Sequence, residues 1–143
     1  MLEPWLAVGL WAGLILLAST RYLSFEKTAR PFVELSHRLF PKAPVRRLSS
    51  WHLYGRKLAH WVGYFVLTLL VAGALEHQLP RVARHWQLAL ALLSTTLFAA
   101  IDEMHQAYVP TRVGSLADVA IDACGGLCAI LFLLALDLQS VAD

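Results

Sequence analysis

The sequence predicts an all-α membrane protein: a bundle of four transmembrane helices with a cytoplasmic amphipathic segment between the first and the second. Of its 143 residues, 58% are apolar and only 15% are charged, whereas soluble domains carry roughly 25% charged residues. Residues 4–20, 58–75 and 85–101 contain no Asp, Glu, Lys or Arg, and residues 113–136 contain only two. Because about 20 helical residues cross a bilayer core, each stretch is long enough for one span. The length allows one domain, residues 1–143, and the composition excludes a disordered chain.

Positively charged residues predict the orientation of the chain. Nine of the twelve Lys and Arg residues lie between residues 21 and 57. Short loops rich in Lys and Arg stay on the cytoplasmic side, so residues 23–56 are expected to be cytoplasmic and both termini outside. The expected spanning helices are residues 4–22, 57–76, 86–106 and 115–137.

The first apolar stretch is expected to be a retained helix and not a cleaved signal peptide. It starts with Glu3 in place of basic residues, and it is longer than the usual apolar core of about 7 to 15 residues. Trp5 near one end and Tyr22 near the other suit the two membrane interfaces, where aromatic side chains gather.

The basic segment that follows has apolar residues at nearly helical spacing, namely Phe32, Val33, Leu35, Leu39 and Phe40. With Arg38 and Lys42 nearby, this spacing predicts an amphipathic helix between Arg30 and Pro41. Such a helix would lie on the inner leaflet, attracted by anionic lipid head groups. The alternative is a solvated loop with scattered apolar residues. Pro41 and Pro44 are expected to end the helix before the second span.

Polar residues occur near the predicted cytoplasmic ends of the second, third and fourth helices. They are Lys57, His60 and Tyr64 on the second, Asp102, Glu103 and Gln106 on the third, Arg112 in the connection, and Asp118 and Asp122 on the fourth. By their spacing, the three on the second helix share one face. Ionisable residues in membrane helices are costly and usually mark a site or an internal pair. These segments are therefore expected to supply one polar cluster.

Some of these residues also have purely structural explanations. Ser115 and Asp118 match the Ser-x-x-Asp capping box, in which side chains satisfy free amides at a helix start. Arg112 could pair with Glu103 and hold two helix ends together, and Lys57 could be an interfacial anchor. In that interpretation the cluster ties helices together and binds nothing.

Two cysteines and two glycines lie together on the fourth helix, at Cys124, Gly125, Gly126 and Cys128. Cysteines four residues apart on a helix have poor geometry for a disulfide bond. All four are therefore interpreted as small residues that permit close helix approach.

Taken together, the polar motifs are specific. They are Arg56-Lys57-Leu58-Ala59-His60 with Tyr64, Asp102-Glu103-x-x-Gln106, Arg112 with Asp118, and Asp122 with Gly125-Gly126. The set resembles the VanZ-like family of small bacterial integral membrane proteins over residues 56 to about 130, and the four-helix plan extends the resemblance to nearly the whole chain. One departure is Asp122, because its position is commonly Asn in that family. The resemblance implies a place in the bacterial cytoplasmic membrane, and the family's namesake is associated with low-level resistance to the glycopeptide teicoplanin.

The first functional hypothesis is a membrane-embedded enzyme that acts on a lipid or a lipid-linked envelope precursor near the inner leaflet. Lys57 and Arg112 would hold its anionic head group. His60 and Glu103 would serve as general base and acid, with Asp118 orienting the histidine or binding a cation.

The second hypothesis is a protein that binds or transports a lipid head group without chemistry. Tyr64, Gln106 and Asp122 would contact the ligand in either case. Transport would require a homo-oligomer, because four helices are few for a complete path. Nothing indicates a nucleotide-binding loop or a nucleic-acid surface.

No resident cofactor is expected, although a divalent cation stays open as a bridge between carboxylates and phosphate. Asp102, Glu103, His60, Asp118 and Asp122 include oxygen and nitrogen groups of the kinds that bind metals. No HExxH or other tight ligand spacing is present, so the sequence leaves the metal unknown.

Overall fold

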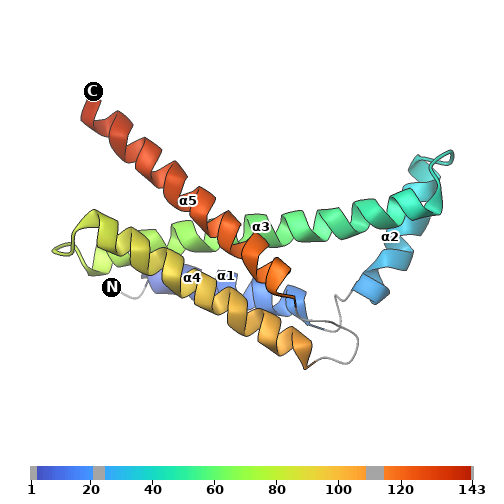
Figure 1. Ribbon diagram of the computed structural model, residues 1–143, viewed down its shortest axis with the longest axis horizontal. Coiled ribbons are helices and arrows are strands. Elements are labelled where there is room, and N and C mark those ends of the chain that lie inside the picture. Colours follow the sequence, from blue (N-terminus) through green and yellow to red (C-terminus); the bar gives the residue numbers. More distant parts are fainter. Residues whose placement is uncertain (1–2, 21–24, 109–114, 143) are drawn as a thin grey trace.

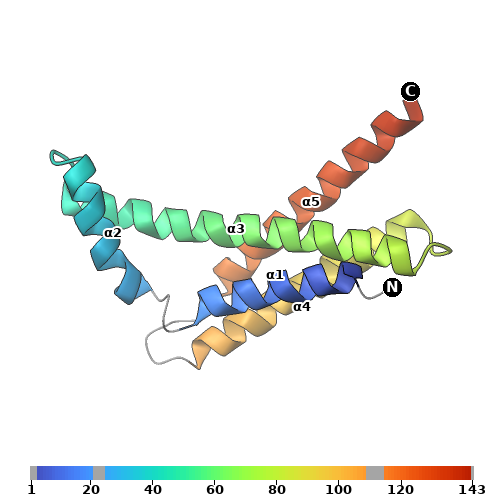
Figure 2. The same ribbon diagram turned by 180° about the vertical axis from the view of Figure 1, so that it is seen from behind.

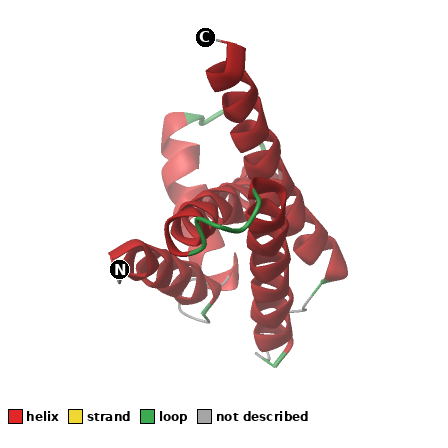
Figure 3. Ribbon diagram, turned by 90° about the vertical axis from the view of Figure 1, so that its left-hand side faces the viewer, coloured by secondary structure: helices red, strands yellow, loops and turns green. Residues whose placement is uncertain are grey.

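A computed structural model describes residues 3–20, 25–108 and 115–142. Within these ranges the chain is all-α, as predicted, and Figure 3 shows only helices and the loops that join them. The helices are α1 (Glu3–Ser19), α2 (Phe25–Leu39), α3 (Val45–Gln78), α4 (Arg84–Ala107) and α5 (Leu116–Ala142).

Three of these helices, α3, α4 and α5, are long and apolar enough to cross a membrane. The first predicted span, residues 4–22, corresponds to α1, which is apolar but has 17 residues. At 1.5 Å per residue it is about 26 Å long, somewhat shorter than a hydrocarbon core of about 30 Å.

α3 begins earlier than predicted and is the central helix of the fold. It starts at Val45, directly after Pro44, and not at residue 57. Hydropathy marks only the part of a helix that suits hydrocarbon, whereas backbone hydrogen bonding continues through polar residues. α3 packs against each of the other four helices, and most extensively against α5. Figure 1 shows α5 crossing α3, with α1 and α4 lying along it.

The predicted amphipathic segment between the first two spans is helical, as α2. It starts at Phe25 and ends at Leu39, just before Pro41. α2 packs on the first part of α3, and Figures 1 and 2 both show it lying across the end of that long helix.

The core is built from small and apolar residues where α1, α3, α4 and α5 meet. Among the side chains with almost no exposed surface are Ala72 of α3, Ala91 and Ala99 of α4, and Ala129 of α5. Small side chains at helix interfaces let the backbones approach closely, which strengthens packing in a membrane.

α5 approaches α3 closely at Gly125 and Gly126, as the sequence predicted. A Cβ atom added to Gly125 would lie 2.3 Å from the carbonyl oxygen of Trp61, and one added to Gly126 would lie 2.9 Å from Thr68 Oγ1. Thr68 Oγ1 also lies 3.0 Å from Thr95 Oγ1, so α4 is joined to α3 at the same level. Cys124 and Cys128 are free thiols.

Gly125→Ala is predicted to destabilise the protein, because its methyl group would overlap the Trp61 backbone, which cannot move aside like a side chain. The expected loss is about 1–3 kcal/mol, measured as a lower thermal unfolding midpoint in detergent. Gly73→Ala on α3 is the control, since open space surrounds that position. It is expected to leave the midpoint unchanged or raise it slightly. Equal effects of the two substitutions would contradict the close approach.

Candidate functional site

The structure brings the predicted polar residues of three helices to one end of the bundle. Lys57, His60 and Tyr64 come from α3, Asp102, Glu103 and Gln106 from α4, and Asp118 and Asp122 from α5. We call these eight residues, together with Ser19 of α1, the polar cluster. Arg112, predicted to contact the same ligand, lies outside the described residues.

An ion pair and a contact between a histidine and a carboxyl group connect α3 to α5 in the polar cluster. The ammonium group of Lys57 pairs with the carboxylate of Asp118, and both side chains are about one-third exposed, at 36% and 35%. One turn deeper, His60 Nδ1 lies 3.7 Å from Asp122 Oδ2, and the Asp122 side chain is only 1% exposed. The cluster therefore has an accessible edge and a buried interior.

This pairing differs in part from the expected roles. Asp122, and not Asp118, is the carboxylate next to His60. Asp118 instead contacts a cationic side chain, Lys57. The reason is helical geometry: positions 57 and 60 lie about one turn apart on α3, and positions 118 and 122 lie about one turn apart on α5. Each residue of one pair therefore meets its counterpart on the other helix.

Asp102 is the centre of a buried hydrogen-bond network between α1 and α4. Ser19 Oγ donates to Asp102 Oδ2 at 2.7 Å, and Gln106 Nε2 donates to the same oxygen at 3.1 Å. The Gln106 amide also lies 3.3 Å from Ser19 Oγ. The role of Ser19 was not predicted, because a single serine near the end of an apolar helix is common and no residue of its own segment marks it as a hydrogen-bond donor.

Glu103 caps the first turn of α5 and thereby changes the predicted capping box. Ser115 Oγ accepts a hydrogen bond from the Ala117 N–H, as an N-cap residue does. The reciprocal bond, from the Ser115 N–H, goes to Glu103 Oε2 on α4 at 2.9 Å. Glu103 thus takes the acceptor role expected of Asp118, and the Asp118 carboxylate pairs with Lys57 across the helix interface.

Three buried polar atoms of the cluster have no hydrogen-bond partner within the described part of the chain. They are Tyr64 Oη, Asp102 Oδ1 and Asp122 Oδ2. The carboxyl groups of Asp102, Glu103 and Asp122 are all close enough to the Tyr64 hydroxyl to interact with it electrostatically. Burying a polar group without a partner costs about 1–3 kcal/mol. Hydrogen bonds from an additional group would therefore stabilise the polar cluster.

Metal binding is not favoured by the described geometry. In residues 3–20, 25–108 and 115–142, no three His, Cys, Asp or Glu side chains are placed to hold one metal ion. The five carboxylate and imidazole groups considered from the sequence instead form pairs and hydrogen bonds with neighbouring helices.

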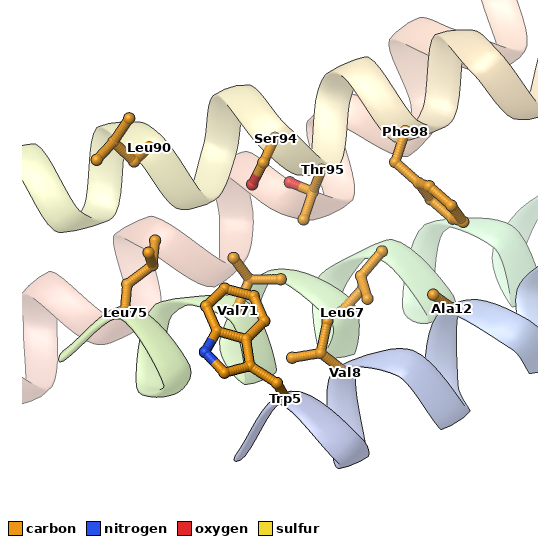
Figure 4. A pocket seen from close by; sticks show the side chains of 10 residues that line it. All are labelled: Trp5, Val8, Ala12, Leu67, Val71, Leu75, Leu90, Ser94, Thr95 and Phe98. Carbon is orange, nitrogen blue, oxygen red and sulfur yellow. The ribbon is translucent and has the colours of Figure 1, made fainter. Parts of the chain in front are cut away.

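An apolar cavity of about 340 Å³ lies between α1, α3 and α4, farther along the bundle from the polar cluster (Figure 4). Its lining residues are Trp5, Val8, Ala12, Leu67, Val71, Leu75, Leu90, Ser94, Thr95 and Phe98. At one end, the ring of Phe98 lies 6.2 Å from that of Tyr64, centroid to centroid. Tyr64 therefore separates a buried polar region from an apolar one.

The helices and the buried ionisable cluster define a small multi-helix membrane protein with an internal polar site. A family model described as VanZ/LLP1 matches residues 4–137. This match covers nearly the whole chain, and the protein belongs to the VanZ/LLP1 family. No curated protein and no solved structure matches the chain.

Ser19→Ala is predicted to loosen α1 from α4, because it removes a hydrogen bond to the buried Asp102. The expected loss of stability is about 1–3 kcal/mol, seen as a lower thermal unfolding midpoint in detergent. Ser94→Ala is the matched control, since among the described residues the Ser94 hydroxyl donates to the Ala91 carbonyl of its own helix and to no other helix. Its expected effect is within about 0.5 kcal/mol. A Ser19→Ala protein as stable as the control would show that Asp102 does not hold α1.

Proposed function

We propose that this protein binds the anionic head group of a membrane lipid or lipid-linked envelope precursor at the polar cluster. The observation that carries the proposal is the set of buried polar atoms that lack a hydrogen-bond partner among the described residues, next to the accessible pair Lys57 and Asp118. Ionisable groups are costly in a membrane and are retained there mainly for function.

The charges of the cluster favour a particular kind of head group. Four carboxyl groups face one lysine and one histidine among the described residues, so a bare anion would be repelled. A phosphate could pair with Lys57, and with Arg112 in the adjoining connection, while hydroxyl or amine groups of the same ligand donate to the carboxylates. We therefore propose a phosphate-bearing head group that also carries hydrogen-bond donors.

The apolar cavity suits the hydrocarbon part of such a ligand. It reaches the polar cluster at Phe98, which contacts Tyr64, and it has no charged lining residue. A lipid with its head group at Lys57 would direct its chain along α3 toward this cavity.

The proposed setting is the bacterial cytoplasmic membrane, with α1 as a fourth span, residues 23–56 in the cytoplasm and both chain ends outside. The basic residues next to the polar cluster support this orientation, because such segments stay on the cytoplasmic side. At the other end of the bundle, Arg84 pairs with Glu76 and Asp137 and so joins α4 to α3 and α5. A link to teicoplanin tolerance is proposed from the family resemblance alone.

Catalysis on the bound lipid is a second candidate function, favoured by the contact of His60 with Asp122. A buried carboxylate beside an imidazole fixes its orientation and stabilises its protonated form, which suits a general base. Glu103, the residue that follows Asp102 on α4 and lies close to Asp118, is the proposed general acid.

Lys57→Gln is predicted to reduce the amount of anionic lipid that co-purifies with the protein, because it removes the accessible cation of the cluster. The expected loss of affinity is about tenfold or more, as for a hydrogen bond to a charged group. Native mass spectrometry of the detergent-purified protein measures it. Arg81→Gln, which removes an exposed cation in the connection between α3 and α4, is the control and should retain the lipid. Equal retention by both variants would rule out a head-group site at Lys57.

His60→Gln, Glu103→Gln and Asp122→Asn are each predicted to stop conversion of the bound lipid while the folded protein still retains intact lipid. Lipid products are measured by mass spectrometry after incubation with the wild-type protein or a variant. Glu76→Gln, which changes an exposed carboxylate that pairs with Arg84, is the control and should leave conversion unchanged.

Two other outcomes separate the alternatives. Intact, stoichiometric lipid on the wild-type protein, with no product, would indicate binding without catalysis. Variants that lower the thermal unfolding midpoint but leave lipid retention unchanged would indicate that the polar cluster only ties the helix ends together.

A further inference from the structure

α3 is too long to lie entirely within the hydrocarbon core of a membrane. With 34 residues α3 is about 51 Å long, roughly 20 Å longer than that core. Its uncharged stretch begins at residue 58, so residues 45–56 extend toward the head groups. Figure 1 shows this end of α3 reaching beyond the neighbouring ends of α1 and α4, with α2 lying across it. We call α2 and residues 40–56 the stem.

The stem is a packed unit with a small core of its own. Leu48 is fully buried and Ser36 nearly so, although both lie outside the main bundle. The ring of Phe32 on α2 lies 4.9 Å from that of His52 on α3, and Phe40 meets Trp51 edge to face at 5.6 Å. α2 is therefore held in place against α3. The side chains on the outer surface of the stem thus have fixed positions relative to one another.

That outer surface is both basic and apolar. Residues 25–56 contain seven Lys or Arg residues and two Glu residues. Large apolar side chains are exposed beside them, namely Leu35, Leu39, Phe40, Val45, Leu53 and Tyr54. Exposed apolar side chains mixed with cations are typical of a surface that contacts anionic membranes, where the cations meet phosphate and the apolar groups enter the acyl boundary.

A shallow groove of about 440 Å³ lies on the α3 side of the stem. It is lined by Pro44, Arg46, Arg47, Ser50, Trp51 and Tyr54. Arg47, Trp51 and Tyr54 are spaced by four and three residues, so they follow one face of α3. A guanidinium group suits phosphate because it offers a planar pair of donors, and Trp and Tyr suit the head-group layer.

We propose that this groove binds the phosphate of an anionic phospholipid of the cytoplasmic leaflet and so holds the stem on the membrane surface. Charge complementarity supports this occupant, because both arginines of the groove are exposed and exposed apolar side chains flank them, as on a surface that contacts an anionic membrane. The groove is separate from the polar cluster, since the ten residues from Arg47 to Lys57 span about 15 Å of helix.

The test compares phosphatidylglycerol with phosphatidylcholine on the full chain in detergent, by native mass spectrometry at increasing lipid concentration. Arg46→Gln with Arg47→Gln is expected to lower the preference for phosphatidylglycerol by roughly 25-fold, and Arg47→Gln alone by roughly fivefold. Arg81→Gln, an exposed arginine of the α3–α4 connection, is the matched control and should change the preference by less than about twofold.

An unchanged lipid preference in the double variant would overturn the proposal, as would an equal loss in Arg81→Gln. The outcome is independent of the polar cluster. Lys57→Gln should keep the part of the preference that the stem arginines supply, and the double variant should still retain the lipid bound at Lys57. Free-energy effects of sites this far apart are expected to add, so the fold-losses of the two changes multiply in the combined variant.

Discussion

The close approach of α5 to α3 at Gly125 sets how the charged residues of the two helices meet. No side chain fits there, because a Cβ atom would lie 2.3 Å from the Trp61 carbonyl oxygen. His60 directly precedes Trp61, and Asp122 lies one turn before Gly125, so the same approach sets His60 beside Asp122. Lys57 and Asp118 then meet one turn farther toward the helix ends. Small residues thus make the charge pairs possible.

The pairing of these side chains determines which polar groups of the cluster can contact a ligand. Within a membrane, polar groups must find partners inside the protein, and most of those in the polar cluster do. Asp102 holds Ser19 and Gln106, and Glu103 caps α5. Within the described part of the chain, Tyr64 Oη, Asp102 Oδ1 and Asp122 Oδ2 lack a hydrogen-bond partner, and the Tyr64 ring lies beside Phe98 at the border of an apolar cavity. This combination of an accessible cation, buried acceptors and a nearby apolar space is chemically suited to a lipid head group and its chain.

The stem places a second set of cations outside the bundle. The positive residues that predict a cytoplasmic loop are carried on two packed helices, so they have fixed positions relative to exposed aromatic side chains. The same residues can therefore both set the orientation of the chain in the membrane and contact lipid. Because α3 runs continuously from the stem into the polar cluster, a lipid bound at the surface and one bound in the bundle would touch the same helix.

The sequence by itself determined the all-α class, the apolar helices, the helical nature of the segment before Pro41 and the family, because periodicity and charge are local properties. It also indicated which end of the bundle is polar, since Lys57 and His60 lie near the start of one apolar stretch and Asp102 directly follows another. Only the tertiary structure decided the partners. Ser19 joins Asp102, Asp122 and not Asp118 meets His60, and Glu103 replaces Asp118 as a cap, because each of these contacts depends on the rotation and depth of one helix relative to another.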